Sequence, residues 1–434
     1  MSRWRSRVAE ALDAVAAVFP PLEEAYVPAR ARIVLEKYRR RRDRYAEICR
    51  MRGLTYHEAQ TSSHLEQRLG TRGYRPAARR IGEIHTFAFI PRIGWHDHLY
   101  QGLRALGPVT EFDYAALGYR WSAFQQGGRR GLQQRQEMNA RVLPVLEAAH
   151  RKRPVDWVFV YASGLEISAD LVGEIERRVG VPTVNMCLDD KQSWEGLWMG
   201  DHRAGQVDIA RAFDLSWTSA RVACEWYLAE GGRPLYLPPG CDPDQLSPRA
   251  VPQDIDVSFV GQRYGFRRNA IRFLERMGVN VETFGRGWPQ GQISDEAMIE
   301  IFCRSHINLG FGGIGAAEAL TNVKARDFDV PCTGGGVYLT SFNPDLALHF
   351  DVGREIVCYR SRDEMLELIR YHLARPDEAR RIAVAARARC LREHLWTHRY
   401  VRVCQVLGLL EQVEPAFNPA SRSLPDPPPQ PCAD

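Results

Sequence analysis

The sequence has no Cys-x-x-Cys pair among its ten cysteines, and no cysteine spacing typical of a zinc site. Six of the cysteines lie in or beside apolar runs: Cys187, Cys224, Cys303, Cys332, Cys358 and Cys404. We therefore interpret the cysteines as buried, reduced thiols rather than as disulfide partners or metal ligands. Such thiols are typical of a reducing compartment, and we expect a cytoplasmic protein.

Long apolar runs are missing as well. No segment approaches the roughly 20 apolar residues that are needed to cross a bilayer. The N-terminal stretch MSRWRSRVAEALDAVAAVFPPLEE contains no uninterrupted apolar segment of signal-peptide length. We therefore expect no transmembrane segment. The formal net charge of +5 is small for 434 residues, so it does not by itself indicate a nucleic-acid partner.

Positive charge is concentrated near the N-terminus. Between residues 30 and 80 there are fifteen Lys or Arg and five Asp or Glu, and residues 38–45 read YRRRRDRY. We expect residues 1–80 to form a basic helical extension. It is either a solvated extension that packs through a few apolar residues, or a contact for an anionic membrane lipid, nucleic acid or acidic acceptor through residues 30–80. The apolar residues available for packing are Ile33, Val34, Tyr38, Tyr45 and Ile48.

From Ile84 onwards, short apolar runs alternate with amphipathic helical stretches. Runs such as IHTFAFI, DWVFVYASG and PTVNMCL read as buried strands, and the rhythm restarts after Pro252 with VSFVGQ, INLGFG and VYLTSF. This alternation is typical of parallel sheets covered on both faces. A chain of 434 residues is also too long for one comfortable core. We expect an α/β protein with two doubly wound, Rossmann-like domains that face a cleft.

The predicted boundaries follow from these patterns. The basic extension covers residues 1–80, the first Rossmann-like domain 81–250, the second 251–395, a helix that crosses back to the first domain 396–414, and a Pro-rich disordered tail 415–434.

Candidate binding residues follow the strands of the second domain, because ligands of doubly wound sheets bind outside the carboxyl ends of the strands. After VSFVG comes QRYGFRRN, a glycine turn that opens a helix and exposes backbone N–H groups suited to phosphate. This segment matches neither G-x-G-x-x-G nor a Walker loop. After VETFG comes a loop that offers backbone contacts and an aromatic ring to a flat base. The candidates here are Gly261, Arg263, Arg267, Gly285, Arg286 and Trp288, although Arg267 and Arg268 also fit surface positions, and Trp288 fits a packed loop.

A second set of candidates lies between the glycine-rich loop GGIG and the turn Gly334–Gly336. Asn322 and Lys324 lead to a helix that we expect to start around Ala325. Lys324 and Arg326 then stand near a positive helix end, which is unfavourable without a compensating anion. A bound diphosphate supplies that anion, and Asp329, one turn into the helix, could accept hydrogen bonds from ribose hydroxyls.

At these residues the sequence resembles the GT-B glycosyltransferases, in particular the branch with a C-terminal domain of the spore-maturation (CgeB-like) type. The matching segments are FVGQR, NVKARDFD, CTGGGVYLTSFNPDL, GREIVCYRSRDEM and ARRIAVAARARCLREHLWTHRY, in that order. The first domain matches loosely, through RIGWHDHL, MCLDDKQSW and DLSWTSA.

The resemblance implies a hexosyltransferase-type enzyme. A nucleotide-diphosphate sugar would be held by the second domain, and an acceptor hydroxyl of a glycan, peptide or small molecule mainly by the first. It implies no bound metal and no covalent cofactor: Arg263 and Lys324 would contact the diphosphate, supported by Arg326, with Asp329 in place of a ribose-binding glutamate. The sequence departs from many retaining members at Thr321, where they carry a second acidic residue; Glu318 is near but out of register.

Candidate catalytic residues lie in the first domain. His96, Asp97 and His98 follow the strand IHTFAFI at the start of a helix, where one of them could act as a general base. Asp97 is equally well explained as a helix-start residue. Asp189 and Asp190 end the strand PTVNMCL and could act as a base, bind a metal ion, or bond structurally.

Two further hypotheses remain open. The protein could be a non-catalytic assembly or nucleotide-binding protein with a GT-B-like fold, which Thr321 favours. Alternatively, it could bind nucleic acid or anionic lipid through its basic N-terminal helices.

Overall fold

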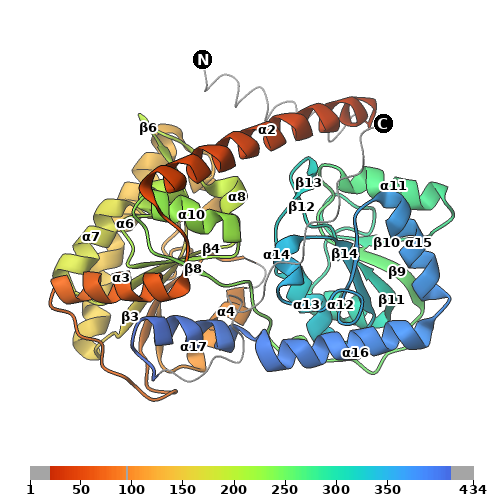
Figure 1. The fold of residues 1–434 in the computed structure, drawn as a ribbon. Helices are drawn as coiled ribbons and strands as arrows, with labels where there is room; N and C mark the ends of the chain where they lie inside the picture. The colour runs from red at the N-terminus through yellow and green to blue at the C-terminus, as the bar shows by residue number, and fades with distance from the viewer. Residues whose placement is uncertain (1–19, 94–95, 412–434) are drawn as a thin grey trace.

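The computed structural model describes residues 20–93 and 96–411, and Figure 1 shows two α/β halves side by side with one long helix lying across both. The Pro-rich tail predicted from residue 415, and Gly94 in the RIGWHDHL motif, lie outside the described residues. Each half contains one parallel sheet, as the sequence predicts.

The first sheet has the strand order β2-β1-β3-β4-β7-β8, and every pair of neighbours is parallel. Its strands are β1 (Thr86–Phe89), β2 (Val109–Glu111), β3 (Trp157–Tyr161), β4 (Thr183–Cys187), β7 (Leu215–Thr218) and β8 (Pro234–Tyr236). The helices of this half are α3 (Glu58–Thr71), α4 (His96–Arg104), α5 (Trp121–Phe124), α6 (Gly128–Lys152), α7 (Ala169–Arg178), α8 (Asp190–Ser193), α9 (Gln206–Ile209) and α10 (Arg221–Ala229). A small hairpin, β5 (Leu197–Met199) and β6 (His202–Ala204), lies outside the sheet.

The second sheet has the order β10-β9-β11-β14-β15 and is also parallel throughout. Its strands are β9 (Ile255–Val260), β10 (Glu282–Phe284), β11 (Ser305–Leu309), β14 (Val337–Ser341) and β15 (Val357–Tyr359). Its helices are α11 (Arg267–Arg276), α12 (Asp295–Arg304), α13 (Arg326–Thr333), α14 (Pro344–Ala347), α15 (Arg362–Leu373) and α16 (Pro376–Glu393). A short antiparallel hairpin, β12 (Gly313–Ile314) and β13 (Ala317–Thr321), leaves the sheet after β11.

Both sheets are buried on two faces, which explains why their strands read as continuous apolar runs. In β3, Trp157 and Phe159 pack against α3 and α4, whereas Val158 and Val160 pack against α6 and α7. In the second half, α11 and α15 cover one face of the sheet, and α12 and α13 the other.

The helix–turn–strand segment that starts at Arg326 forms as the sequence predicts. Helix α13 ends at Gly334, whose φ of +61° is left-handed and therefore suits glycine. Strand β14 follows, and α14 then begins at Asn343, whose side chain accepts a hydrogen bond from the Asp345 backbone N–H.

The last described helix, α17 (Trp396–Val406), belongs to the core of the first half although the second half precedes it in the chain. Trp396 and Tyr400 pack against Trp217, and Tyr400 also meets Phe159 edge to face. Helix α16 leads into it along the lower side of the molecule (Figure 1).

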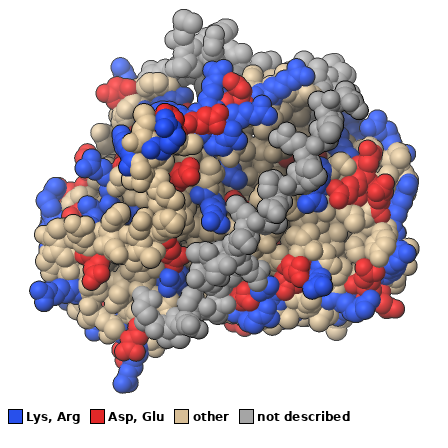
Figure 2. Space-filling model, viewed as in Figure 1, with Lys and Arg blue, Asp and Glu red and all other residues tan. Residues whose placement is uncertain are grey.

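Helix α2 (Pro20–Arg52) is the long helix that lies across both halves, and Lys and Arg side chains gather along it (Figures 1 and 2). The Tyr45 hydroxyl donates to Glu230 at 2.6 Å and accepts from Trp194 Nε1 at 3.0 Å, which fixes the helix to the first half. Burial, followed by the bond to Glu230, raises the pKa of Tyr45 to about 12. Val34 and Leu35 pack against the β12–β13 hairpin of the second half. Helix α2 therefore packs on both halves through apolar residues, and Val34, Tyr38, Tyr45 and Ile48 contribute as the sequence predicts. Ile33, expected to help pack it, is 50% exposed.

Within residues 20–93 and 96–411, no helix is long and apolar enough to span a bilayer. The nine cysteines in the same ranges are all buried and free.

Candidate active site

The two halves meet at the carboxyl ends of their strands, where doubly wound sheets bind ligands. Both sheets reverse their strand order there, between β1 and β3 in the first and between β9 and β11 in the second. Two cavities lie in this region, one of about 510 Å³ and one of about 330 Å³.

The larger cavity is bounded by α2, by α8, by the loop after β9 and by the β12–β13 hairpin. Arg263, in the loop after β9, lines it together with Lys191 and Gln192 of α8. The loop approaches the hairpin closely because residue 265 is glycine. Its φ is +59°, and a Cβ there would lie 2.1 Å from the carbonyl oxygen of Gly315.

The neighbouring candidates in this loop region are largely engaged within the protein. Trp288 is only 9% exposed, packs edge to face on Phe259, and donates its Nε1–H to the Gly261 carbonyl at 2.8 Å. The ring therefore occupies the packed loop position, one of the two alternatives that the sequence left open. Gly285, with a φ of +120°, would place a Cβ 2.5 Å from the same carbonyl oxygen, which makes it a close-packing glycine.

Two arginines of this region also differ from their expected roles. Arg267 lies over the Tyr264 ring at 4.2 Å and donates to the Gln262 carbonyl. Burial is the main cause that lowers its pKa. The side chain of Arg286 is exposed, while its carbonyl accepts the backbone N–H of Arg263 at 2.9 Å and so fixes the Arg263 loop.

Asn322 and Lys324 bind the first half directly. The Asn322 side-chain amide donates to the Leu188 carbonyl at 2.7 Å, and Lys324 Nζ lies 3.2 Å from Asp189 Oδ1. Lys191 reaches the other way, because its Nζ donates to the carbonyl of Thr321 at 2.9 Å. This junction joins the segment that follows β4 to the segment that follows β13.

The segment Asp189–Gln192 is consequently the link between the two predicted phosphate-binding cations. Asp189 pairs with Lys324, whereas Lys191 and Gln192 share the larger cavity with Arg263. Lys191 was not predicted from the sequence; its position beside Asp189 and Asp190 at a strand end was the available signal.

The start of α13 carries three acidic or basic side chains, of which Asp327 is buried, whereas Arg326 and Asp329 are half-buried. Arg326 lies over the Phe302 ring and contacts the Met298 sulfur, so it points into the second half rather than towards an anion at the junction. Asp327, which the sequence analysis passed over, accepts the Lys324 backbone N–H at 2.7 Å and the Tyr338 hydroxyl at 2.6 Å. It fixes the loop that carries Lys324.

Asp329 faces the first half. Burial raises the pKa of its carboxyl group to about 6, and the nearby His98 and Arg326 partly oppose that rise. His98 is 5% exposed on α4, and its Nδ1 has no hydrogen-bond partner within the described ranges. One predicted catalytic residue, His98, therefore acts electrostatically on one predicted donor residue, Asp329, across the junction.

His96 and Asp97 lie apart from this pair. His96 Nδ1 lies 3.1 Å from the Asp97 carboxylate, and its Nε2 lies 3.3 Å from Glu111 at the end of β2. The Asp97 side chain is 84% exposed, as suits a residue at a helix start. These contacts hold His96 against Glu111 and do not place it beside Asp329.

Asp190 turns away from the junction. It is fully buried, and its two oxygens accept the Thr218 hydroxyl at 2.5 Å and the Tyr227 hydroxyl at 2.8 Å. Burial raises its pKa to about 6. Asp190 is therefore an internal structural group, and this geometry contradicts both its base role and a metal site shared with Asp189. Within the described residues, no group of three or more His, Cys, Asp or Glu could hold a metal ion.

The smaller cavity lies at the carboxyl ends of β1, β3 and β4, entirely within the first half. Asp189 stands at its edge, and Glu166 lines it. Glu166 is 3% exposed and accepts hydrogen bonds from Gln125 and from the Ser163 hydroxyl and backbone N–H. Burial raises its pKa. The sequence analysis missed Ser163 and Glu166, although both follow the clear strand signal DWVFVY.

Stability near Asp329 should depend on pH. Because its folded-state pKa is about 6 and the unfolded value is about 3.9, the folded protein binds this proton more tightly. This group should therefore stabilise the fold as pH falls from about 6 to about 4. We expect Asp329→Asn to remove that contribution. As pH falls, the free energy of unfolding of the wild type should therefore rise relative to that of the variant. Urea unfolding of both proteins at pH 7, 6 and 5 measures this change in the free energy of unfolding. A difference in free energy of unfolding that does not vary with pH would contradict the enclosed environment of the Asp329 carboxyl group.

Comparison with known proteins places this geometry in a class. The chain is similar in fold to sucrose-phosphate synthase from Thermosynechococcus elongatus, at 11% identity, covering 75% of this chain and 98% of that chain with a TM-score of 0.52. It is similar to HepE from Anabaena, solved in complex with UDP and glucose, at 11% identity, covering 76% of this chain and 100% of that chain with a TM-score of 0.50. The fold is GT-B.

A family described as glycosyl transferase-like matches residues 263–405, which run from the Arg263 loop to α17. The second half therefore carries a glycosyl transferase-like domain. A comparison with curated protein sequences gives no match.

Proposed function

We propose that the protein transfers a sugar from a nucleoside-diphosphate sugar to a hydroxyl group of an acceptor. The observation that carries this proposal is the glycosyl transferase-like match over residues 263–405, which includes Arg263, Lys324 and Asp329. These residues lie in the region where the two halves of a GT-B fold meet. The CgeB-like subtype, hexosyl specificity and a cytoplasmic location remain predictions.

In this proposal the leaving diphosphate lies at the junction, near Lys324 and the Arg263 loop. Fixed positive charge in a partly buried setting stabilises the charge that develops as the bond to the anomeric carbon breaks. Lys324 has a protein partner, Asp189, whose carboxylate the diphosphate would replace. These cations would serve where other transferases use a metal ion.

The smaller cavity is the proposed acceptor site. It adjoins the junction through Asp189, whose side chain is 51% exposed and borders both the cavity and Lys324. An acceptor hydroxyl in the cavity could give its proton to Asp189 while its oxygen forms the new bond to the anomeric carbon. The diphosphate departs with the electron pair of the broken bond. His98 remains the second candidate base, beside Asp329.

Binding of nucleoside diphosphates tests this proposal. We expect at least one of UDP, ADP and GDP to raise the melting temperature, because a ligand that binds only the folded state stabilises it by about 2.7 kcal/mol at 100 times its Kd. The matching nucleoside monophosphate should raise it less. If none of the three moves the transition, the proposed donor site is wrong.

A second candidate function is nucleotide binding without transfer. Thr321, at the position of the second acidic residue of many retaining members, favours it, and its backbone carbonyl accepts a hydrogen bond from Lys191 Nζ. Binding of a nucleoside-diphosphate sugar with no sugar released or transferred across a panel of acceptors would support this alternative.

A further inference from the structure

Helix α2 has two distinct faces. One face packs on both halves of the molecule, through Val27, Ala31, Leu35, Tyr38 and Tyr45. Tyr38 and Tyr45 contact Trp226 of the first half, whereas Ala31 and Leu35 contact the β12–β13 hairpin of the second. This face explains how a helix with a strongly basic sequence is held across the junction.

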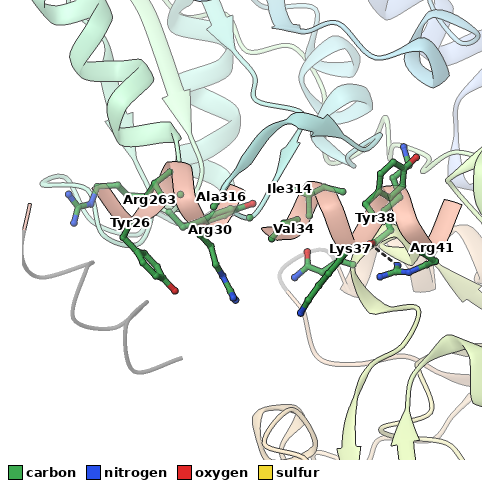
Figure 3. A pocket seen from close by; sticks show the side chains of 15 residues that line it. Tyr26, Arg30, Val34, Lys37, Tyr38, Arg41, Arg263, Ile314 and Ala316 are labelled. Atoms are coloured by element: carbon green, nitrogen blue, oxygen red, sulfur yellow. Dashed lines mark hydrogen bonds between the residues drawn. The ribbon is translucent and has the colours of Figure 1, made fainter. Parts of the chain in front are cut away.

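The other face lines the larger cavity. Its residues are Tyr26, Arg30, Val34, Lys37 and Arg41, which are spaced by 4, 4, 3 and 4 positions. The two faces adjoin, because Val34 also packs on the β12–β13 hairpin, and Val27 and Tyr38 also border the cavity. At about 100° per residue they form one stripe roughly 80° wide, next to the packing stripe. Figure 3 shows Tyr26, Arg30 and Lys37 projecting from the same side of the helix. The helix thus presents a cationic wall to the cavity.

Cations outnumber anions in the lining of this cavity, although two of the cations have a carboxylate partner: Lys191 Nζ lies 3.8 Å from Asp345 Oδ2, and Arg41 Nε lies 3.6 Å from Glu195 Oε1. Five of its lining residues are Arg or Lys, namely Arg30, Lys37, Arg41, Lys191 and Arg263, and none is Asp or Glu. Arg41 donates to the Lys191 carbonyl and lies over the Trp226 ring, so it is held in place. Lys37 is exposed and makes no hydrogen bond or ion pair with the described part of the chain. Burial lowers the pKa of Lys191, which is the effect expected where positive charge is enclosed.

We propose that this cavity binds a phosphate-bearing ligand and that α2 supplies part of the site through Arg30 and Lys37. A cavity of about 510 Å³ with cations on three walls fits a phosphate or diphosphate group with part of its organic moiety. The ligand can be the nucleoside-diphosphate donor or a phosphorylated sugar acceptor. The inference rests on the proposed function through Arg263, which the cavity shares with the proposed donor site.

The site also links ligand binding to the arrangement of the two halves. Its walls come from α8 of the first half, from the Arg263 loop of the second half and from α2, which packs on both. An anion bound among these walls holds all three in place, since its charge is shared between them.

Calorimetric titration of the full chain with inorganic pyrophosphate, UDP and glucose 6-phosphate tests this proposal. We expect Arg30→Ala/Lys37→Ala to weaken at least one of them 10-fold or more. The matched control is Arg32→Ala/Arg39→Ala, which removes the same charge from two exposed residues on the opposite side of α2. It should leave the affinity within about twofold, because distant exposed charges are screened. The melting temperature of each variant without ligand shows whether α2 remains docked.

The outcomes separate this inference from the proposed function. Equal weakening by both double variants, or no binding of any probe, overturns the inference. If UDP binding depends on Lys324 but not on Arg30 and Lys37, the proposed function stands and the inference fails. If pyrophosphate and glucose 6-phosphate bind through Arg30 and Lys37 while no nucleoside diphosphate binds, the inference about the cavity is supported and the proposed donor site is wrong. If Arg30→Ala/Lys37→Ala loses UDP binding, the ligand of the larger cavity is the donor. If it loses only glucose 6-phosphate binding, the ligand is a phosphorylated acceptor.

Discussion

Replacing Lys324 with alanine should weaken the binding of a nucleoside diphosphate by up to about 100-fold. A hydrogen bond to a charged group contributes about 1.5–3 kcal/mol, and 1.4 kcal/mol corresponds to a tenfold change in affinity. Lys324 is only 25% exposed, so solvent screens its charge less than that of a surface lysine. Calorimetric titration of the wild type and Lys324→Ala with UDP, ADP or GDP measures the loss. Arg263→Ala should also weaken the binding of the nucleoside diphosphate.

The matched control is Asp189→Asn, which removes the negative partner of Lys324 but keeps the lysine. This variant should bind the diphosphate as tightly as the wild type or more tightly, because the anion no longer competes with a carboxylate 3.2 Å from Lys324 Nζ. Its rate of sugar transfer should fall if Asp189 accepts the acceptor proton. Weaker diphosphate binding in Asp189→Asn, or unchanged binding in Lys324→Ala, would contradict the proposed position of the diphosphate.

Replacing Asp214 with alanine should destabilise the protein by about 3–5 kcal/mol, as is typical when one partner of a buried ion pair is removed. Asp214 is fully buried and lies 2.8 Å from Nε of Arg68 on α3 and 2.7 Å from Nη2 of Arg72, the residue that follows α3. It also accepts the Thr183 backbone N–H at the start of β4. The variant would leave Arg68 and Arg72 with Glu176 as their remaining carboxylate partner and would loosen α3 from the sheet.

Urea unfolding followed by circular dichroism measures this loss of stability. The control is Asp254→Ala, since Asp254 forms a similar bidentate pair with Arg304, but on the surface, where its side chain is 52% exposed. Exposed pairs contribute little to stability, so this variant should unfold close to the wild-type midpoint. Equal effects of the two substitutions would show that α3 is not held by the buried pair.

The fold was predictable because its signals are local and repeated. Strands buried on both faces must be apolar throughout, so the runs around Phe159 and Phe259 show in the sequence as parallel strands. The same holds for the turn at Gly334, where a left-handed residue has to end α13. The arrangement of α2 was harder to predict, because its packing stripe is interrupted by arginines and its partners, Trp194 and Trp226, lie far away in the chain.

The site was predictable only in part. Position after a strand directed attention to Asp189 and Lys324, and the structure brings these two side chains to 3.2 Å from each other. Position in the sequence could not distinguish the role of Asp189 from that of Asp190, because neighbouring side chains at a strand end point in different directions. The Asp190 carboxylate accepts hydrogen bonds from the Thr218 and Tyr227 hydroxyl groups. For Trp288 the sequence left base stacking and a packed loop position open, and the structure shows the packed position, in which Nε1–H donates to a backbone carbonyl.

The central claim is that a diphosphate lies at the junction of the two halves, and a crystal structure of the protein with a nucleoside diphosphate tests it most directly. The account predicts diphosphate oxygens within about 3 Å of both Lys324 Nζ and the Arg263 guanidinium group, with Lys324 released from Asp189. A diphosphate bound elsewhere, with the Lys324–Asp189 pair intact, would contradict it.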